Sequence, residues 1–146
     1  MAILERIGFY FQTVIQIASD PVHIAILFGS VILGIIFGAM PGLTSTLGVA
    51  LLTALTYGMD TATAMLCLLA IYVGGTYGGS YASILFNIPG TAASAATALD
   101  GYPLAGKGEG GRAIGLTTTS SAIGRIISML FLVSISPRIS FFALQF

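Results

Sequence analysis

Two proline–glycine breaks interrupt the apolar stretches of this chain, and they constrain its fold more than any other feature. The first break covers residues 41–46 and the second covers residues 87–91. Proline removes a backbone donor and clashes with the preceding turn, and inside a bilayer the freed carbonyl and amide groups cannot turn to water. Broken helices at membrane depth therefore line cavities, and their hydroxyl-capped N-termini suit anionic substrates and coupling cations. The breaks favour a secondary transporter.

The composition of the chain is that of a membrane protein. Of its 146 residues, 56% are hydrophobic and 7% are charged, with a mean hydropathy of +1.01, whereas soluble domains carry roughly 25% charged residues. The formal net charge is zero, so the sequence lacks the basic patch that nucleic-acid binding requires. We therefore expect an all-α integral membrane protein with no nucleic-acid partner.

The lengths of the apolar runs predict about three full transmembrane helices, two proline–glycine-broken helices that are re-entrant or half-length, and an N-terminal amphipathic helix. Crossings are expected at residues 22–40, 61–86 and 113–135, and the surface helix at residues 3–17, where a short ordinary leader helix is equally compatible. Residues 47–57 and 92–99 are too short to cross, and the second of them is expected to end at Asp100 and Gly101. The chain then forms one membrane domain, with an interfacial helix (1–20), a broken-helix transport unit (21–99), a polar loop (100–112) and a further span (113–146).

Glycines recur at a spacing of four in the first two crossings. Such spacing places them on one helix face, where another backbone can approach closely, so it is first of all a packing device. A second interpretation is that hydroxyl side chains between the glycines, including Tyr77 and Ser80, line a polar cavity. The glycines are Gly34 and Gly38 in the first crossing, and Gly74, Gly75, Gly78 and Gly79 in the second.

Four polar residues lie inside or beside the apolar runs. Arg125 falls within the third crossing, where a charge is costly, so it should face protein, a cavity or an interface, unless it snorkels to one end. Asp60 and Asp100 each follow a short helix and are candidates for binding a coupling cation or proton, although a solvated loop acid or a helix cap is the favoured interpretation of both. Asn87 lies at the second break, where its amide either bridges freed backbone groups or coordinates substrate or sodium.

The sequence offers little for an enzyme. Residues 101–107 and 106–111 resemble nucleotide-binding loops, but neither follows a predicted strand. Residues 78–82 fall one residue short of a nucleophile elbow, and the chain's single histidine, His23, has no predicted position near Ser80. No cluster has metal-ligand spacing. We therefore expect no catalytic residue and no cofactor beyond a transported sodium ion or proton.

Five motifs follow one another along the chain: Gly38-Ala-Met-Pro-Gly-Leu-Thr44, Thr56-Tyr-Gly-Met-Asp60, Ile71-Tyr-Val-Gly-Gly-Thr-Tyr-Gly-Gly-Ser80, Ile84-Leu-Phe-Asn-Ile-Pro-Gly-Thr91 and Ala98-Leu-Asp-Gly-Tyr-Pro103. In this order and spacing they closely resemble the large membrane subunit, or permease, of the tripartite tricarboxylate transporters. The resemblance runs from about residue 20 to residue 120.

The resemblance implies a multi-pass permease of the bacterial inner membrane that carries citrate or related di- and tricarboxylates, driven by a sodium or proton gradient. It also implies two partners, a periplasmic solute-binding protein and a small membrane subunit. In the family the glycine–proline loops are thought to form the substrate and ion sites. Carried onto this chain, these residues are Pro41, Gly42, Leu43, Thr44, Ser45 and Thr46 at one break, and Asn87, Pro89, Gly90 and Thr91 at the other.

The chain departs from the family pattern in three ways. The family's large subunit is several times longer, so the chain resembles its N-terminal part, and a pathway built from two halves would require a homo-oligomer if only one half were present. Thr53-Ala54 and Ala92 stand where proline-containing pairs are common, and Arg125 stands where a small residue is expected. The alternative to a transporter is a noncatalytic membrane interaction module, or a degenerate fragment, that packs through its glycine faces.

Overall fold

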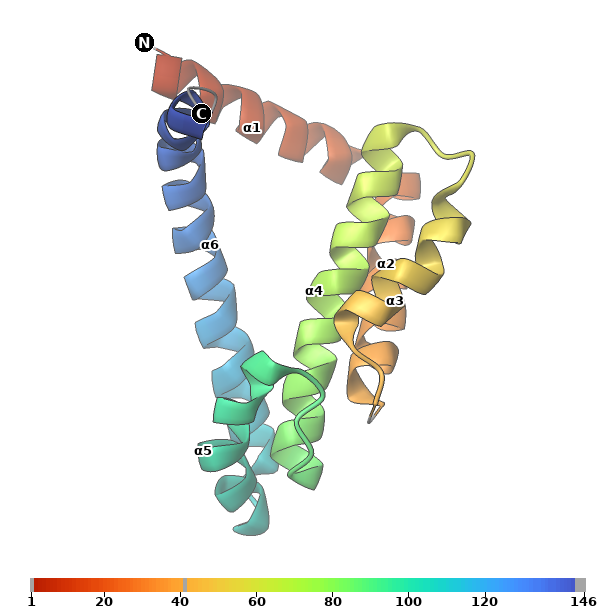
Figure 1. Cartoon of the computed structure of the whole chain (residues 1–146), viewed down its shortest axis with the longest axis vertical. Coiled ribbons are helices and arrows are strands. Elements are labelled where there is room, and N and C mark those ends of the chain that lie inside the picture. The colour runs from red at the N-terminus through yellow and green to blue at the C-terminus, as the bar shows by residue number, and fades with distance from the viewer. Residues whose placement is uncertain (1, 41, 144–146) are drawn as a thin grey trace.

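The computed structural model describes residues 2–40 and 42–143, which form helices joined by short connections (Figure 1). The prediction of an all-α membrane protein is confirmed. Three helices among the described residues are long and apolar enough to cross a membrane: α2, α4 and residues 110–136 of α6. The elements are α1 (Ala2–Ser19), α2 (Pro21–Ala39), α3 (Ser45–Leu52), η1 (Thr53–Thr56), α4 (Thr61–Phe86), η2 (Ala92–Ser94), α5 (Ala95–Gly106) and α6 (Gly110–Ala143).

Side-chain caps set where the helices of the first half begin. Asp20 accepts the Val22 N–H at 2.9 Å ahead of α2, and Thr44 accepts the Leu47 N–H at 3.2 Å ahead of α3. Asp60 accepts the Thr63 N–H at 3.1 Å ahead of α4. Each cap satisfies a donor that the first turn of a helix leaves free. The chain is thereby divided at the positions where the apolar runs were predicted to start.

Helices α2 and α4 pack together through their glycines, side by side and in parallel (Figure 1). A Cβ atom added to any of four of these glycines would overlap a backbone carbonyl oxygen of the opposite helix. The packing interpretation of the small-residue spacing is therefore confirmed. The four contacts join Gly34 to Ile71, Gly38 to Gly75, Gly74 to Val31 and Gly78 to Ile35.

The predicted polar loop is wrong for most of its length. We expected a short helix to end near Leu99 and residues 100–112 to form a loop, but α5 continues through Asp100 and Pro103 to Gly106, and α6 begins at Gly110. Gly101 packs directly against Ile84 of α4, where a Cβ atom would lie 2.6 Å from Ile84 Cγ1. This long-range contact stabilises a helix that local composition does not favour, since glycine is an unfavourable residue in a helix interior.

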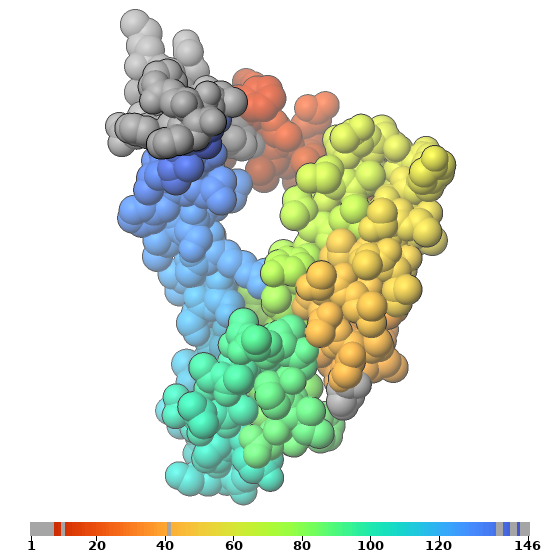
Figure 2. All heavy atoms as spheres, viewed as in Figure 1, coloured from red at the N-terminus to blue at the C-terminus, as the bar shows by residue number. Residues whose placement is uncertain are grey.

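The remaining helices frame an open space. Helix α6 rises from the end of α5, is hydrogen-bonded to α4 at Thr118 and Arg125, and diverges from α2 and α4 toward its C-terminal end, while α1 crosses at the end of the molecule opposite α5 (Figure 1). Figure 2 shows an opening bordered by α1, α4 and α6. Residues 3–17 are helical, as predicted, and lie within α1. The location of α1 at a membrane surface stays a prediction.

Candidate functional site

The two proline–glycine breaks meet on one face of α4. At the first break, a Cβ atom on Gly75 would lie 2.7 Å from Ser45 Oγ. At the second break, a Cβ atom on Gly79 would lie 3.2 Å from Thr91 Cγ2. Gly75 and Gly79 are four residues apart and therefore share a helix face. Two segments more than forty residues apart in the sequence are thus brought within one helical turn of each other.

Gly90 joins the second break to both membrane helices. A Cβ atom on Gly90 would lie 2.8 Å from the Gly79 Cα and would overlap the Gly38 carbonyl oxygen near the end of α2. The carbonyls of the last turn of a helix have no partner within that helix. The second break therefore lies beside backbone oxygens that the end of α2 leaves available.

Hydroxyl groups cap the helices that leave the breaks. Thr91 and Ser94 form a reciprocal capping box at η2, in which the Ser94 N–H donates to Thr91 Oγ1 at 3.3 Å and the Thr91 N–H donates to Ser94 Oγ at 3.1 Å. Ser45, in the first turn of α3, is 3% exposed, and its Oγ has no hydrogen-bond partner among the described residues. A buried hydroxyl without a partner is rare in folded proteins and calls for an explanation.

A cavity of about 260 Å³ lies beside the second break, between α4, η2, α5 and α6. Drug-sized ligands occupy pockets of roughly 300–1,000 Å³, so this volume suits a smaller molecule. Every lining residue except Ala93 and Arg125 carries a hydroxyl group: Thr76, Tyr77, Ser80, Thr91, Ser94, Thr97, Thr117 and Ser121. The wall is rich in hydroxyl groups, although those of Thr76, Ser80 and Ser94 donate to backbone carbonyls, and its one charge is positive.

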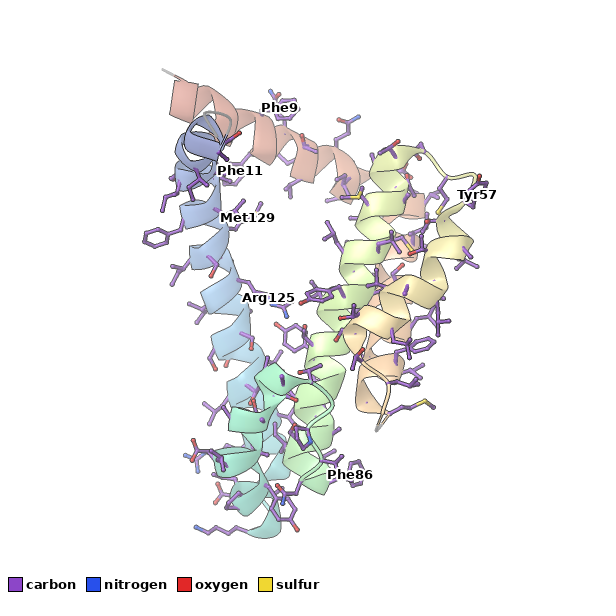
Figure 3. The ribbon with its side chains drawn as sticks, in the orientation of Figure 1. Phe9, Phe11, Tyr57, Phe86, Arg125 and Met129 are labelled. Atoms are coloured by element: carbon purple, nitrogen blue, oxygen red, sulfur yellow. The ribbon has the colours of Figure 1, made fainter. Side chains whose placement is uncertain are left out.

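Arg125 supplies that charge from α6. Its Nη2 donates to Thr76 Oγ1 at 2.8 Å, and its guanidinium carbon lies 4.6 Å from the centre of the Tyr77 ring. Figure 3 shows the side chain reaching from α6 toward α4. Among the described side chains, no carboxylate forms an ion pair with it. The sequence marked Arg125 as a charge that should face protein or a cavity, but it did not name Arg125 as a site residue.

The structure distributes the residues of the two breaks unevenly. Thr91 lines the cavity, as do the predicted cavity residues Tyr77 and Ser80. Leu43 is half-buried, whereas Gly42, Thr44 and Thr46 are exposed, and Pro41 lies outside the described residues. Pro89 is also exposed. Asn87 is exposed and ends α4 in the left-handed region, with φ of 55°, so the structure supplies a backbone role for it.

The two candidate coupling acids occupy different places. Asp60 caps the first turn of α4, and Thr76 lies sixteen residues further along that helix, roughly 24 Å away at 1.5 Å per residue. Asp100 lines a second cavity of about 380 Å³ between α5 and α6. That cavity shares Thr97, Thr117 and Ser121 with the cavity of Arg125. Of the two acids, only Asp100 lines a cavity that shares polar wall residues with the cavity of Arg125.

The single histidine lies far from Ser80. His23 Nδ1 lies 2.7 Å from Asp20 Oδ2, and its Nε2 lies 3.2 Å from Thr63 Oγ1, at the N-terminal ends of α2 and α4. Ser80 lies seventeen residues beyond Thr63, roughly 26 Å along the helix. No serine–histidine pair for nucleophilic catalysis is formed. Within the described part of the chain, no group of three or more metal-binding side chains is found.

The comparisons with known proteins agree with this membrane architecture. The model of the tripartite tricarboxylate transporter TctA family matches residues 24–146. The chain belongs to this family. A protein of Agrobacterium vitis, described as an uncharacterized 52.8 kDa protein in the TAR-I ttuC' 3' region, is 35% identical over all 146 residues. The chain spans 28% of the length of that relative. No solved structure matches. Membership in the TctA family confirms the resemblance.

Proposed function

We propose that the chain is the permease, or part of the permease, of a binding-protein-dependent carboxylate transporter of the bacterial inner membrane. Its substrates are citrate or related di- and tricarboxylates, moved by secondary active transport. Membership in the TctA family and three membrane-length helices support this proposal. The observation that carries it is the meeting of both proline–glycine breaks on one face of α4, beside a hydroxyl-lined cavity whose arginine forms no ion pair with a described side chain.

The groups at the two breaks suit two different ligands, a carboxylate substrate and a sodium ion. Hydroxyl-capped helix starts, such as that at Thr91, present N–H and O–H donors that favour a carboxylate. Hydroxyl oxygens and free carbonyls, such as Ser45 Oγ and the carbonyls that end α2, are hard ligands that suit sodium. The proposal therefore places substrate and ion near each other, with Gly79 and Gly90 allowing the segments to pack closely.

Of the two acids, Asp100 is the better candidate for coupling to the ion gradient. It lines the cavity that adjoins the Arg125 cavity, whereas Asp60 caps the N-terminus of α4, far from Arg125. A carboxylate near the substrate cavity can bind a sodium ion or a proton when the substrate binds. We place the coupling role on Asp100 for this reason.

The partners follow from the family. Tripartite systems combine a permease with a periplasmic solute-binding protein and a small membrane subunit, and we propose both for this chain. The competing function, a noncatalytic module that packs through its glycine faces, has less support, because the contacts of Gly34, Gly38, Gly74 and Gly78 join α2 to α4 within the chain itself. Those faces are consequently not free to bind another protein.

Uptake of radiolabelled citrate and tricarballylate into vesicles that contain the protein and its partner subunits tests the proposal. We expect accumulation that requires an imposed sodium or proton gradient. Asp100→Asn is expected to lower gradient-dependent accumulation at least tenfold, and Asp60→Asn, the matched control, to leave it within about twofold. Failure of every di- and tricarboxylate to accumulate under either gradient would overturn the proposed function. Equal losses in the two variants would remove only the assignment to Asp100.

A further inference from the structure

We propose that Arg125 is the residue that binds a carboxylate group of the substrate, and that Thr76 and Tyr77 hold its guanidinium group at the cavity wall. This inference rests on the proposed function and names the residue that recognises the substrate. Nothing in the resemblance to the family points to this position, since a small residue was expected there.

The first argument is the charge of the cavity. Arg125 lies within the part of α6 that is long and apolar enough to cross a membrane, where an ionised side chain is costly and usually marks a functional pathway. Arg125 is part-buried, and ionisable side chains in membrane-spanning segments normally pair with one another or with backbone carbonyls. Yet the ion pairs among the described residues are those of Asp20 with His23 and of Glu109 with Arg112. A bound anion would supply the missing partner of Arg125.

The second argument is the weakness of the present contacts. A guanidinium group carries five N–H donors in a planar fork that matches the two oxygens of a carboxylate. Thr76 Oγ1 takes one of these donors, and the Tyr77 ring lies against the face of the group. Both contacts are with neutral groups, whereas a carboxylate forms a charge-assisted, bidentate pair that is stronger. A substrate carboxylate can therefore replace the contacts that hold the side chain in the empty cavity.

The third argument is the set of donors around Arg125. A di- or tricarboxylate needs partners for its remaining carboxylates, and the cavity offers hydroxyl groups on three sides. Thr91 Oγ1 accepts the Ser94 N–H, which leaves its own hydrogen free to donate to a ligand. Thr97 comes from α5 and Ser121 from α6, one helical turn from Arg125. The arrangement suits an anion with several carboxylates better than a monocarboxylate.

The position of the cavity gives the binding a structural consequence. Thr91 belongs to the second break and packs on Gly79 of α4, whereas Arg125 belongs to α6. A polycarboxylate that bridges Arg125 and Thr91 would tie α6 to the break, next to the opening that α4 and α6 border (Figure 2). Substrate binding would then draw together two parts of the chain that are otherwise separated over most of the length of α6.

Binding of radiolabelled citrate to the purified protein, in detergent and without partner subunits, tests the inference separately from transport. Arg125→Gln is expected to weaken citrate binding at least tenfold, because a charge-assisted hydrogen bond is lost, and Arg125→Lys to weaken it less. Arg112→Gln is the matched control, since Arg112 lies on the same helix, is exposed and pairs with Glu109. We expect the Arg112→Gln variant to bind citrate with the same affinity as the unmodified protein.

The fluorescence of an introduced tryptophan gives a second measurement. A purely structural role of Arg125 would leave this fluorescence unchanged when citrate is added. The 146 residues contain no tryptophan, so Tyr77→Trp places a reporter under the guanidinium group. We expect citrate and tricarballylate to shift its emission in a saturable way, and acetate and glycerol to leave it unchanged. If unmodified protein binds no carboxylate, the proposed function fails together with this inference. If Arg125→Gln elutes as a folded protein and binds citrate with unchanged affinity, only the role of Arg125 is overturned.

Discussion

Gly90 of the second break packs between Gly38 of α2 and Gly79 of α4. A side chain at Gly90 would overlap the Gly38 carbonyl oxygen and would come within 2.8 Å of the Gly79 Cα. Both neighbours are backbone atoms in helices that are themselves locked together, so neither can move aside without separating α2 from α4. The second break can therefore hold this position only because Gly38, Gly79 and Gly90 all lack side chains.

The first prediction concerns this packing. Gly90→Ala is expected to destabilise the protein by about 1–3 kcal/mol, the usual cost of overpacking a tight contact, and to lower citrate uptake as the break moves away from α4. The melting temperature in detergent and the initial rate of uptake measure the two effects. Gly124→Ala is the control, because a Cβ atom there meets nothing within 4 Å. Equal melting temperatures for the two variants would contradict the proposed packing.

The sequence was sufficient to predict the membrane helices and the breaks, because both depend on local properties. Apolar run length places α2, α4 and α6, and the residues Asp20 and Asp60 mark where helices begin. The same local rules give a wrong prediction at Asp100 and Gly101, where they predict the end of a helix. The stabilising contact there is with Ile84, seventeen residues earlier, and composition alone carries no information about such a contact.

The arrangement of the site was harder to predict, since it depends on long-range register. The resemblance carries the glycine–proline loops onto this chain and so predicts Thr91 as a site residue, but its packing on Gly79 follows only from the way the chain folds back on α4. Arg125 was recognised as a costly charge in a span. Its contact with Thr76, forty-nine residues away, could not be read from the spacing of either residue. The charge pattern predicts that Arg125 faces protein, a cavity or an interface unless it snorkels to one end, and the fold places it at the cavity beside the second break.

The second prediction concerns Asn87. Its backbone adopts φ of 55° at the end of α4, and its N–H donates to the Ser83 carbonyl at 3.1 Å. Glycine adopts this conformation without penalty, whereas an alanine pays roughly 1–2 kcal/mol. We therefore expect Asn87→Gly to keep both the melting temperature and citrate uptake, and Asn87→Ala to lower both. If the amide instead coordinates sodium or substrate, Asn87→Gly will lose uptake as fully as Asn87→Ala while its melting temperature stays unchanged.

The third prediction concerns the cap of α4. Asp60 accepts hydrogen bonds from the Thr63 hydroxyl and the Thr63 N–H, which hold the pKa of its carboxyl below the ordinary value of 3.8. The unfolded chain therefore binds the proton more readily, so the stabilisation by Asp60 is complete above pH 3.8 and is lost as the pH falls through the lower, folded pKa. Asp60→Ala should lower the melting temperature by a few degrees at neutral pH, and Asp60→Asn by less, since asparagine also caps helices.

Melting curves of unmodified protein and Asp60→Asn, recorded from pH 6 to pH 3, check the pH dependence. The difference between the two melting temperatures should be constant near neutral pH and should shrink below about pH 3.8. Asp20 also has a pKa lowered by hydrogen bonds, from the Val22 N–H and then from His23, but it is present in both proteins and cancels in the difference. A difference that stays constant down to pH 3 would show that the hydrogen bonds of Asp60 do not favour its ionised form in the folded protein, and would contradict the lowered pKa.

The last prediction concerns Ser45, whose buried Oγ has no partner among the described residues. If this hydroxyl is a ligand of the coupling sodium ion, Ser45→Ala should raise the sodium concentration for half-maximal citrate uptake several-fold. Stability should stay the same or rise slightly, because removing an unpaired buried hydroxyl removes a desolvation cost. Ser30→Ala is the control, since Ser30 is also buried between α2 and α4 but donates to Cys67 Sγ at 3.1 Å. An unchanged sodium dependence in Ser45→Ala, with uptake intact, would exclude Ser45 from the ion site and leave its burial a consequence of packing against Gly75.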